Sequence, residues 1–238
     1  MVQSSQVHSL PALANFSAIV VLAKVDARNV AYLGAFLSVA EVERSQSFKC
    51  KEDRLCYILA HGLKRCIISQ YLCVEPSALS FTKGPHGKPY CLNGEAPHFN
   101  LSHSGDWVAL VFSEQRHVGI DIDFLRSKYR EGLARKICND RQFEWYRQQG
   151  DKRQAFLFLW SQKEALSKAC GRGIAVGMST IECSGVIGEE EVLFGQRSYR
   201  LHSRHIGPNG VLSCAIDGGG SSPEVFLWEA DSTLSNMS

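Results

Sequence analysis

The sequence predicts an α+β fold in which two similar lobes pack against each other. A β-branched run at residues 15–25 is typical of a buried strand, and helical spacing follows around residues 28–37 and 52–72. Short strands come next, before the pattern starts again. Since each half runs strand, helices, strands, we expect an N-terminal lobe of residues 1–115 and a C-terminal lobe of residues 116–238.

In the first half, the strongest signal is the helical stretch at residues 52–72, whose apolar side chains repeat at three- and four-residue spacing. Short strands are expected at residues 80–82 and 107–112, and a glycine- and proline-rich turn at residues 84–89. The polar face of the long helix is interpreted as solvated, and it carries Arg54, His61, Lys64 and Arg65.

The second half repeats this order. A strand is predicted at residues 118–122, one or two helices within residues 126–149, and a long helix at residues 154–170 that stops at Gly171. Further strands are expected at residues 180–183, 191–194, 200–202 and 211–216. The polar tail from about residue 231 is expected to be mobile.

Composition indicates a globular protein of the cytoplasm. Of its 238 residues 45% are hydrophobic, and a net charge of +2 is too small for a protein that neutralises a nucleic-acid backbone. The nine cysteines include no C-x-x-C pair and are odd in number, which argues against zinc and a disulfide framework. The apolar run at residues 18–23 is too short to span a membrane. We therefore expect a cytoplasmic protein with neither a membrane nor a nucleic-acid partner.

Two acidic residues stand out in the strand Val118-Gly119-Ile120-Asp121-Ile122-Asp123. Successive side chains of a strand face opposite sides, so Asp121 and Asp123 share one face at a spacing of roughly 6 to 7 Å. Carboxylates this close repel each other unless a cation lies between them or one of them is protonated. A hard divalent ion is the simplest explanation, although the pair alone would also suit an exposed strand end.

A third acidic residue lies on the helix at residues 154–170, where Glu164 and Lys168 project from one stripe. Two strand aspartates and one helix glutamate suit Mg²⁺, because this ion keeps several waters and takes further ligands from substrate phosphates. The pattern therefore predicts a magnesium site for a phosphate-bearing substrate. Taken alone, Glu164 and Lys168 would be an ordinary surface ion pair.

Four segments occur together over residues 87–168. They are Gly87-Lys88-Pro89-Tyr90, Phe99-Asn100-Leu101-Ser102-His103-Ser104-Gly105, the aspartate strand, and Leu159-Trp160-Ser161-Gln162-Lys163-Glu164-Ala165 followed by Lys168. With these segments in this order, the chain resembles the 4'-phosphopantetheinyl transferases of the Sfp type, which activate carrier proteins. Each segment alone is weak, whereas the ordered set is highly specific.

The resemblance implies two α+β lobes related by a pseudo-twofold axis, each a small, mostly antiparallel sheet with helices, and an active site between them. It implies transfer of the 4'-phosphopantetheine of coenzyme A to a serine of an acyl or peptidyl carrier protein, with release of adenosine 3',5'-bisphosphate. It makes Asp121, Asp123 and Glu164 the Mg²⁺ ligands. It also places on the coenzyme A phosphates the residues Lys88, Ser102, His103 and Lys168.

These roles suit the chemistry of such a transfer. Attack by a serine hydroxyl on phosphorus needs the charge of two linked phosphates neutralised, which a metal ion and fixed cations can supply. We expect Lys168 and His103 to offset charge on the leaving phosphate. We expect Glu164 to take the serine proton, directly or through a metal-bound water.

Some positions depart from the family's pattern. Asp123 stands where relatives often have glutamate, so a water is expected to bridge its shorter side chain to the ion. Gln142 stands where some relatives have a glutamate implicated in catalysis, and an amide cannot act as a base. Cys56 stands where relatives carry a phosphate-binding arginine. Arg44 and Arg54 are the remaining candidates for the 3'-phosphate of coenzyme A.

Two alternative functions remain open. The acidic cluster could activate water in a metal-dependent pyrophosphate hydrolase, or the protein could be a non-catalytic binder of carrier proteins. The carrier could serve fatty acid, polyketide or nonribosomal peptide synthesis, and the slightly basic charge suits an acidic partner. The length favours a monomer, because shorter members of the family need trimers to build two-lobed sites between chains.

Overall fold

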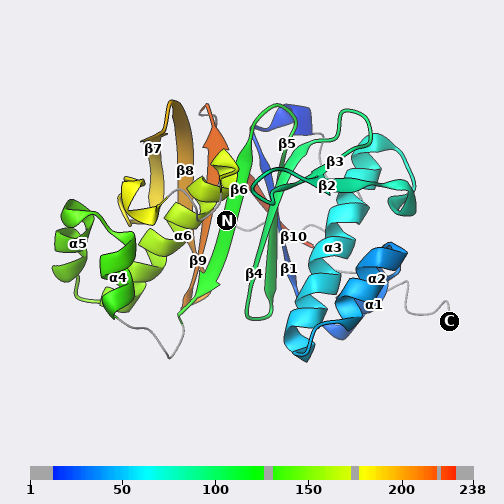
Figure 1. Ribbon diagram of the computed structural model, residues 1–238, viewed down its shortest axis with the longest axis horizontal. Helices are drawn as coiled ribbons and strands as arrows, with labels where there is room; N and C mark the ends of the chain where they lie inside the picture. The colour runs from blue at the N-terminus through cyan, green and yellow to red at the C-terminus, as the bar shows by residue number, and fades with distance from the viewer. Residues whose placement is uncertain (1–12, 126–130, 173–176, 219–220, 229–238) are drawn as a thin grey trace.

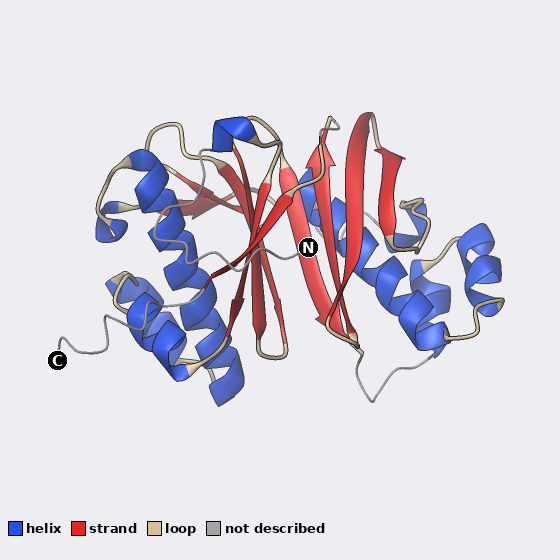
Figure 2. Ribbon diagram, turned by 180° about the vertical axis from the view of Figure 1, so that it is seen from behind, coloured by secondary structure: helices blue, strands red, loops and turns tan. Residues whose placement is uncertain are grey.

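The computed structural model describes residues 13–125, 131–172, 177–218 and 221–228, and within them the chain forms two α+β halves (Figure 1). The strands lie in the centre of the molecule, and helices cover the outer sides of both halves (Figure 2). The predicted α+β class and two-lobed plan are therefore confirmed.

The N-terminal half contains a buried strand, three helices and two hairpins. In chain order its elements are η1 (Leu13–Asn15), β1 (Ile19–Lys24), α1 (Ala27–Gly34), α2 (Val39–Gln46), α3 (Lys51–Leu72), η2 (Pro76–Ala78), β2 (Phe81–Lys83), β3 (Pro89–Cys91), β4 (His98–Ser104) and β5 (Trp107–Ser113). Leu59, Leu63 and Ile67 of α3 pack into one core cluster with residues of β1, β4 and β5, as their helical spacing predicts.

The C-terminal half repeats a strand, helices and strands. Its elements are β6 (Val118–Phe124), α4 (Glu131–Ile137), α5 (Asp140–Arg147), α6 (Lys152–Cys170), η4 (Met178–Thr180), β7 (Gly188–Phe194), β8 (Arg197–Ile206), β9 (Gly210–Asp217) and β10 (Glu224–Trp228). The helix α6 begins at Asp151, whose carboxylate caps the first turn. It ends at Gly171, whose φ of 74° is left-handed backbone that glycine adopts without strain.

One sheet has the strand order β10-β1-β5-β4, the other has the order β6-β9-β8-β7, and β2 and β3 form a separate ribbon. All pairs are antiparallel except β1 and β10. The final strand therefore crosses back from the C-terminal half to the N-terminal sheet, which sequence periodicity did not indicate. The boundary between residues 115 and 116 otherwise stays a prediction.

The strand expected at residues 180–183 is wrong. Met178–Thr180 forms the turn η4, and no strand pairing includes residues 181–183, which lie within the described part of the chain. The carbonyl oxygens of Ile181 and Cys183 instead accept hydrogen bonds of 3.1 and 2.9 Å from Nε2 of Gln142. A buried side chain thus satisfies the backbone that a neighbouring strand would otherwise pair with.

The solvated face expected for α3 is also wrong for Lys64 and Arg65, each only 3% exposed. Lys64 Nζ lies 3.0 Å from Oε1 of Glu41, and Arg65 Nε lies against the other oxygen of the same carboxylate. His61 Nδ1 donates to Oε1 of Glu41 as well, at 3.1 Å. Because a single carboxylate on α2 pairs with these groups, α2 covers a face that α3 alone would present to water.

A second layer of apolar side chains joins the two halves. Val20 and Leu22 of β1 and Val111 of β5 pack with Ile120 of β6 and Leu212 of β9 in one buried cluster. The two sheets therefore share a core, and β4 and β6 meet at the centre of the molecule (Figure 1). No helix in the described ranges has both the length and the apolarity needed to cross a membrane.

Candidate active site

Side chains of β4 bind β6 along the line where the two halves meet. Asn100 Oδ1 accepts from the backbone N–H of Ile120 at 3.0 Å, and Ser102 Oγ donates to Asp121 Oδ1 at 2.9 Å. One step further, Ser104 Oγ donates to Asp123 at 2.7 Å. Alternate residues of β4 therefore face β6, as the twofold period of a strand requires.

The other side of β6 is covered by α6. A Cβ at Gly119 would overlap Ala165 O and Ala169 N of α6, so only glycine permits this close approach. The approach brings Lys168 to Asp121, with Nζ 2.8 Å from Oδ1. The same ammonium donates to Ser102 Oγ and to the carbonyl of Ile120, each at 3.1 Å.

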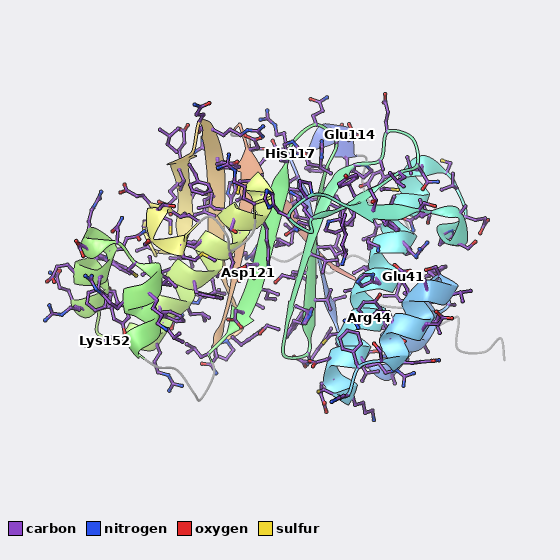
Figure 3. All side chains as sticks on the ribbon, in the orientation of Figure 1. Glu41, Arg44, Glu114, His117, Asp121 and Lys152 are labelled. Atoms are coloured by element: carbon purple, nitrogen blue, oxygen red, sulfur yellow. The ribbon has the colours of Figure 1, made fainter. Side chains whose placement is uncertain are left out.

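Glu164 lies one helical turn before Lys168 and is buried, with 9% of its surface exposed. Burial raises the pKa of its carboxyl group; the positive charge of Lys168 opposes this, and the negative charges of Asp121 and Asp123 add to it. The structure therefore places Glu164 close enough to Asp121, Asp123 and Lys168 for their charges to act on its carboxyl group. Figure 3 labels Asp121 near the middle of the molecule, on β6.

Two oxygen atoms at this centre are buried without a partner. Within the described residues, neither Asp121 Oδ2 nor Glu164 Oε1 has a hydrogen bond. A buried carboxylate oxygen left unpaired costs free energy, and hard cations such as Mg²⁺ take carboxylate oxygens as ligands. The donor set therefore fits Mg²⁺.

The acidic residues do not form a complete metal-binding site among the described residues. In the described part of the chain, no three His, Cys, Asp or Glu side chains converge closely enough to hold an ion. Lys168 and Ser102 both occupy Oδ1 of Asp121, and Ser104 and the N–H of Phe124 both occupy Oδ1 of Asp123. The ligand set Asp121, Asp123 and Glu164 thus stays a prediction.

Family models and curated relatives match most of the chain. A model of the 4'-phosphopantetheinyl transferase superfamily matches residues 117–208, and a model of the N-terminal part of 4'-phosphopantetheinyl transferases matches residues 26–115. The 4'-phosphopantetheinyl transferase HetI of Nostoc is 32% identical over 200 residues, which cover 82% of this chain and 84% of HetI. The chain belongs to the 4'-phosphopantetheinyl transferase superfamily.

Two further relatives support the Sfp-like type. The 4'-phosphopantetheinyl transferase psf-1 of Bacillus pumilus is 30% identical over 80% of this chain and 78% of its own length. The 4'-phosphopantetheinyl transferase Sfp of Bacillus subtilis is 29% identical over 61% of this chain and 65% of its own length. The protein is accordingly an enzyme, a 4'-phosphopantetheinyl transferase.

Arg44 and Arg54, which were expected at the 3'-phosphate of coenzyme A, lie on helices of the N-terminal half, whereas Asp121 lies on β6. Arg44 is exposed on α2, with Nη1 3.0 Å from Ser47 Oγ and its guanidinium 5.0 Å from the ring of Phe48 (Figure 3). Arg54 is exposed in the first turn of α3. His103 is exposed on β4, between two serines that face β6, so its side chain points away from that strand.

Cys56 is buried and takes no part in this centre. Its thiol donates to the carbonyl of Gly105 at 3.3 Å, and burial together with nearby acidic groups raises its pKa to about 11. A neutral thiol tied to a backbone carbonyl cannot replace a phosphate-binding guanidinium.

The side chain of Lys88 makes hydrogen bonds to the backbone, and its expected place on the coenzyme A phosphates stays a prediction. Its Nζ donates to the carbonyls of Val118, Lys168 and Ala169 at 2.8, 2.9 and 3.3 Å. Burial lowers its pKa to about 8, against the opposing charges of Cys170 and Asp217.

Asn100 and Ser104 join the two halves but were missed by sequence reasoning. The signal was present, because Asn100, Ser102 and Ser104 alternate with the apolar residues Phe99 and Leu101. Read as a strand, this segment places all three polar residues on one face.

Proposed function

We propose that the protein transfers 4'-phosphopantetheine from coenzyme A to a serine hydroxyl of a carrier protein, in a Mg²⁺-dependent reaction that releases adenosine 3',5'-bisphosphate. The observation that carries the proposal is the group formed by the buried carboxyl groups of Asp121 and Glu164 with the half-buried Lys168, in which two carboxylate oxygens have no partner among the described residues. Such a group offers oxygen ligands to a divalent ion and an ammonium to a phosphate.

In this reaction the serine oxygen attacks the phosphorus that carries pantetheine, and the bond from that phosphorus to the bridging oxygen breaks. Asp121, Asp123 and Glu164 would hold the ion, which when bound neutralises charge on the two linked phosphates. Lys168 is already fixed by Asp121 and Ser102, so its ammonium needs little reorganisation to stabilise the leaving phosphate.

The serine proton needs an acceptor. Burial raises the pKa of Glu164, and a carboxylate with a raised pKa accepts a proton more readily than an ordinary one. We assign the base to Glu164, directly or through a water. His103 is proposed as a second group that offsets phosphate charge.

Arg44 and Arg54 are proposed for the 3'-phosphate, since both guanidinium-bearing side chains are exposed on the N-terminal half. Arg54 also lies in the first turn of α3, where unpaired N–H groups favour anions.

The acceptor is proposed to be an acyl carrier protein or a peptidyl carrier domain. We propose that the enzyme acts as a cytoplasmic monomer without nucleic-acid or membrane partners, because the single chain supplies residues from both halves to one centre. A net charge of +2 favours encounter with acidic carriers, although only modestly.

The proposed reaction is tested by measuring adenosine 3',5'-bisphosphate by chromatography, with and without an apo carrier protein in the reaction. A transferase forms this product only when carrier, coenzyme A and Mg²⁺ are all present. Product formed at the same rate without carrier would show a pyrophosphate hydrolase instead. Tight binding of the carrier with no product under any condition would show a non-catalytic binder.

A further inference from the structure

Lys88 lies in the turn of the β2–β3 hairpin, and its side chain reaches across to the other half of the molecule. The backbone of the hairpin is closed by hydrogen bonds from Gly84 N to Lys88 O and from Gly87 N to Gly84 O, both 2.9 Å. The hairpin also rests on the N-terminal half, where the ring of Phe81 packs edge-on against Phe99. A fixed loop therefore presents this ammonium to β6 and α6.

All three acceptors of Lys88 are backbone carbonyls of the C-terminal half. Val118 is the first residue of β6, and Lys168 and Ala169 lie in the last turn of α6. Carbonyls in the last turn of a helix lack intrahelical partners and carry the negative end of the helix dipole, so a cation suits this position. The backbone carbonyls at the ends of β6 and α6 thus form a binding site for the ammonium of Lys88.

An ammonium has three N–H donors, and the three carbonyls occupy all of them. A phosphate at Lys88 would compete with these three carbonyls, of which that of Lys168 also accepts from the backbone N–H of Gly171 at 3.3 Å. Lys168 Nζ also has three acceptors, but two of them are the side-chain oxygens of Asp121 and Ser102, and its side chain is 25% exposed.

Lys168 is held at both ends. Its carbonyl accepts from Lys88 at 2.9 Å, while its own ammonium lies 2.8 Å from Asp121. Val118, the third partner of Lys88, begins the strand that carries Asp121 three residues later. Both elements that define the Lys168–Asp121 contact are therefore tied to one side chain of the N-terminal half.

We propose that Lys88 is a positioning residue that ties the β2–β3 hairpin to the ends of β6 and α6, and so sets Lys168 against Asp121, instead of binding a coenzyme A phosphate. The tests that measure transfer rest on the proposed function. The test that measures the contact of Lys88 in the free protein does not depend on it.

A footprinting experiment tests the contact without any variant. The wild-type protein is reductively methylated with formaldehyde and a hydride donor, with and without coenzyme A, and modified lysines are mapped by mass spectrometry. Lys88 is expected to resist methylation in both states, and the exposed Lys83 of the same hairpin to react in both. Methylation of Lys88 in the free protein, with or without protection by coenzyme A, would overturn the proposal.

A double-mutant cycle tests how Lys88 acts. Lys88→Met is expected to lower kcat about tenfold for coenzyme A and for 3'-dephospho-coenzyme A alike, with KM for each changed less than about threefold. In a Lys168→Met background it should cause no further loss, because the effect passes through Lys168. Lys83→Met serves as the matched control and should leave transfer unchanged.

If the losses in kcat of the two single variants multiply in the double variant, the proposal is contradicted. A rise in the KM of Lys88→Met for coenzyme A that abolishes the preference over 3'-dephospho-coenzyme A would also contradict it. If Lys88→Met does not fold, the footprint of the wild-type protein still decides the contact. If the wild-type protein transfers nothing, the proposed function fails while the footprint still reports on Lys88.

Discussion

Asp121 Oδ1 accepts from two donors, Lys168 Nζ at 2.8 Å and Ser102 Oγ at 2.9 Å, whereas its second oxygen is buried without a partner among the described residues. One oxygen of the carboxylate, Oδ1, therefore joins β4, β6 and α6. The other oxygen, Oδ2, is available to a ligand. This division explains how one residue can both stabilise the junction of the two halves and take part in the chemistry.

Replacing Asp121 with asparagine should lower the rate of transfer by at least about 100-fold, on the scale of losing one preorganised electrostatic group. The amide keeps the shape but lacks the negative charge that a divalent ion needs. Initial rates measured over a Mg²⁺ titration check this, and higher Mg²⁺ should restore part of the loss. Glu144→Gln, on the exposed side of α5, is the control. Wild-type rates for Asp121→Asn at every Mg²⁺ concentration would exclude the residue as a ligand.

Gly119→Ala should destabilise the protein by about 3 kcal/mol, the upper range for overpacking a tight contact. The added methyl group would meet Ala165 and Ala169 and force α6 away from β6, so that Lys168 also loses Asp121. Urea unfolding checks the stability. Gly132→Ala in α4, where the described residues leave open space around an added Cβ, should not destabilise. Equal stability of the two variants would contradict the close packing of β6 and α6.

Glu41→Gln should cost about 3 kcal/mol at neutral pH, as expected when buried cations lose their carboxylate. Although burial acts to raise the pKa of Glu41, the hydrogen bond from His61, the charge of Lys64 and the hydrogen bond from Arg65 hold it far below its ordinary value of 4.5. The stabilisation is therefore complete above that ordinary value and is lost as pH falls below it.

Unfolding free energies of Glu41→Gln and wild type, measured from pH 7 to pH 3, check this prediction. The difference should be largest at pH 7 and should shrink as pH falls below about 4.5, where the unfolded chain takes up a proton. A difference that grows toward acid pH would mean that the carboxyl group is protonated in the folded protein.

Gln142→Glu should lower stability by about 2 kcal/mol, on the scale of leaving buried polar groups unsatisfied, and should not raise the rate. Nε2 of Gln142 donates to the carbonyls of Ile181 and Cys183, and a carboxylate would place an acceptor against both. Lys163, whose Nζ lies 2.7 Å from Oε1, would compensate part of its new charge. Stability and single-turnover rates measured side by side check the prediction. A faster variant would show that position 142 can supply a base.

Much of the fold followed from local pattern. The apolar spacing along α3 and α6 and the β-branched run of β1 predicted these elements, because such a period is a pattern among residues only a few positions apart in the sequence. The pairing of β10 with β1 could not be predicted this way, since it depends on contacts across some two hundred residues of chain. The strand expected at residues 180–183 failed because a distant side chain, Gln142, supplies the hydrogen bonds there.

The acidic residues of the candidate site were found from the alternation in β6 and the helical spacing of α6. The surroundings of Lys64, Arg65 and Lys88 were not, because each side chain points toward a segment distant in sequence. A lysine in a turn is usually solvated, and only the folded structure shows Lys88 with three carbonyl acceptors.

The most direct test of the proposed function is the intact mass of an apo carrier protein after incubation with this enzyme, coenzyme A and Mg²⁺. The expected result is a gain of one phosphopantetheine that requires Mg²⁺, and that disappears with Glu164→Ala or when the acceptor serine of the carrier is replaced by alanine. An undiminished gain with Glu164→Ala, or with a chelator present, would contradict a metal-assisted transfer at the Asp121–Glu164–Lys168 centre.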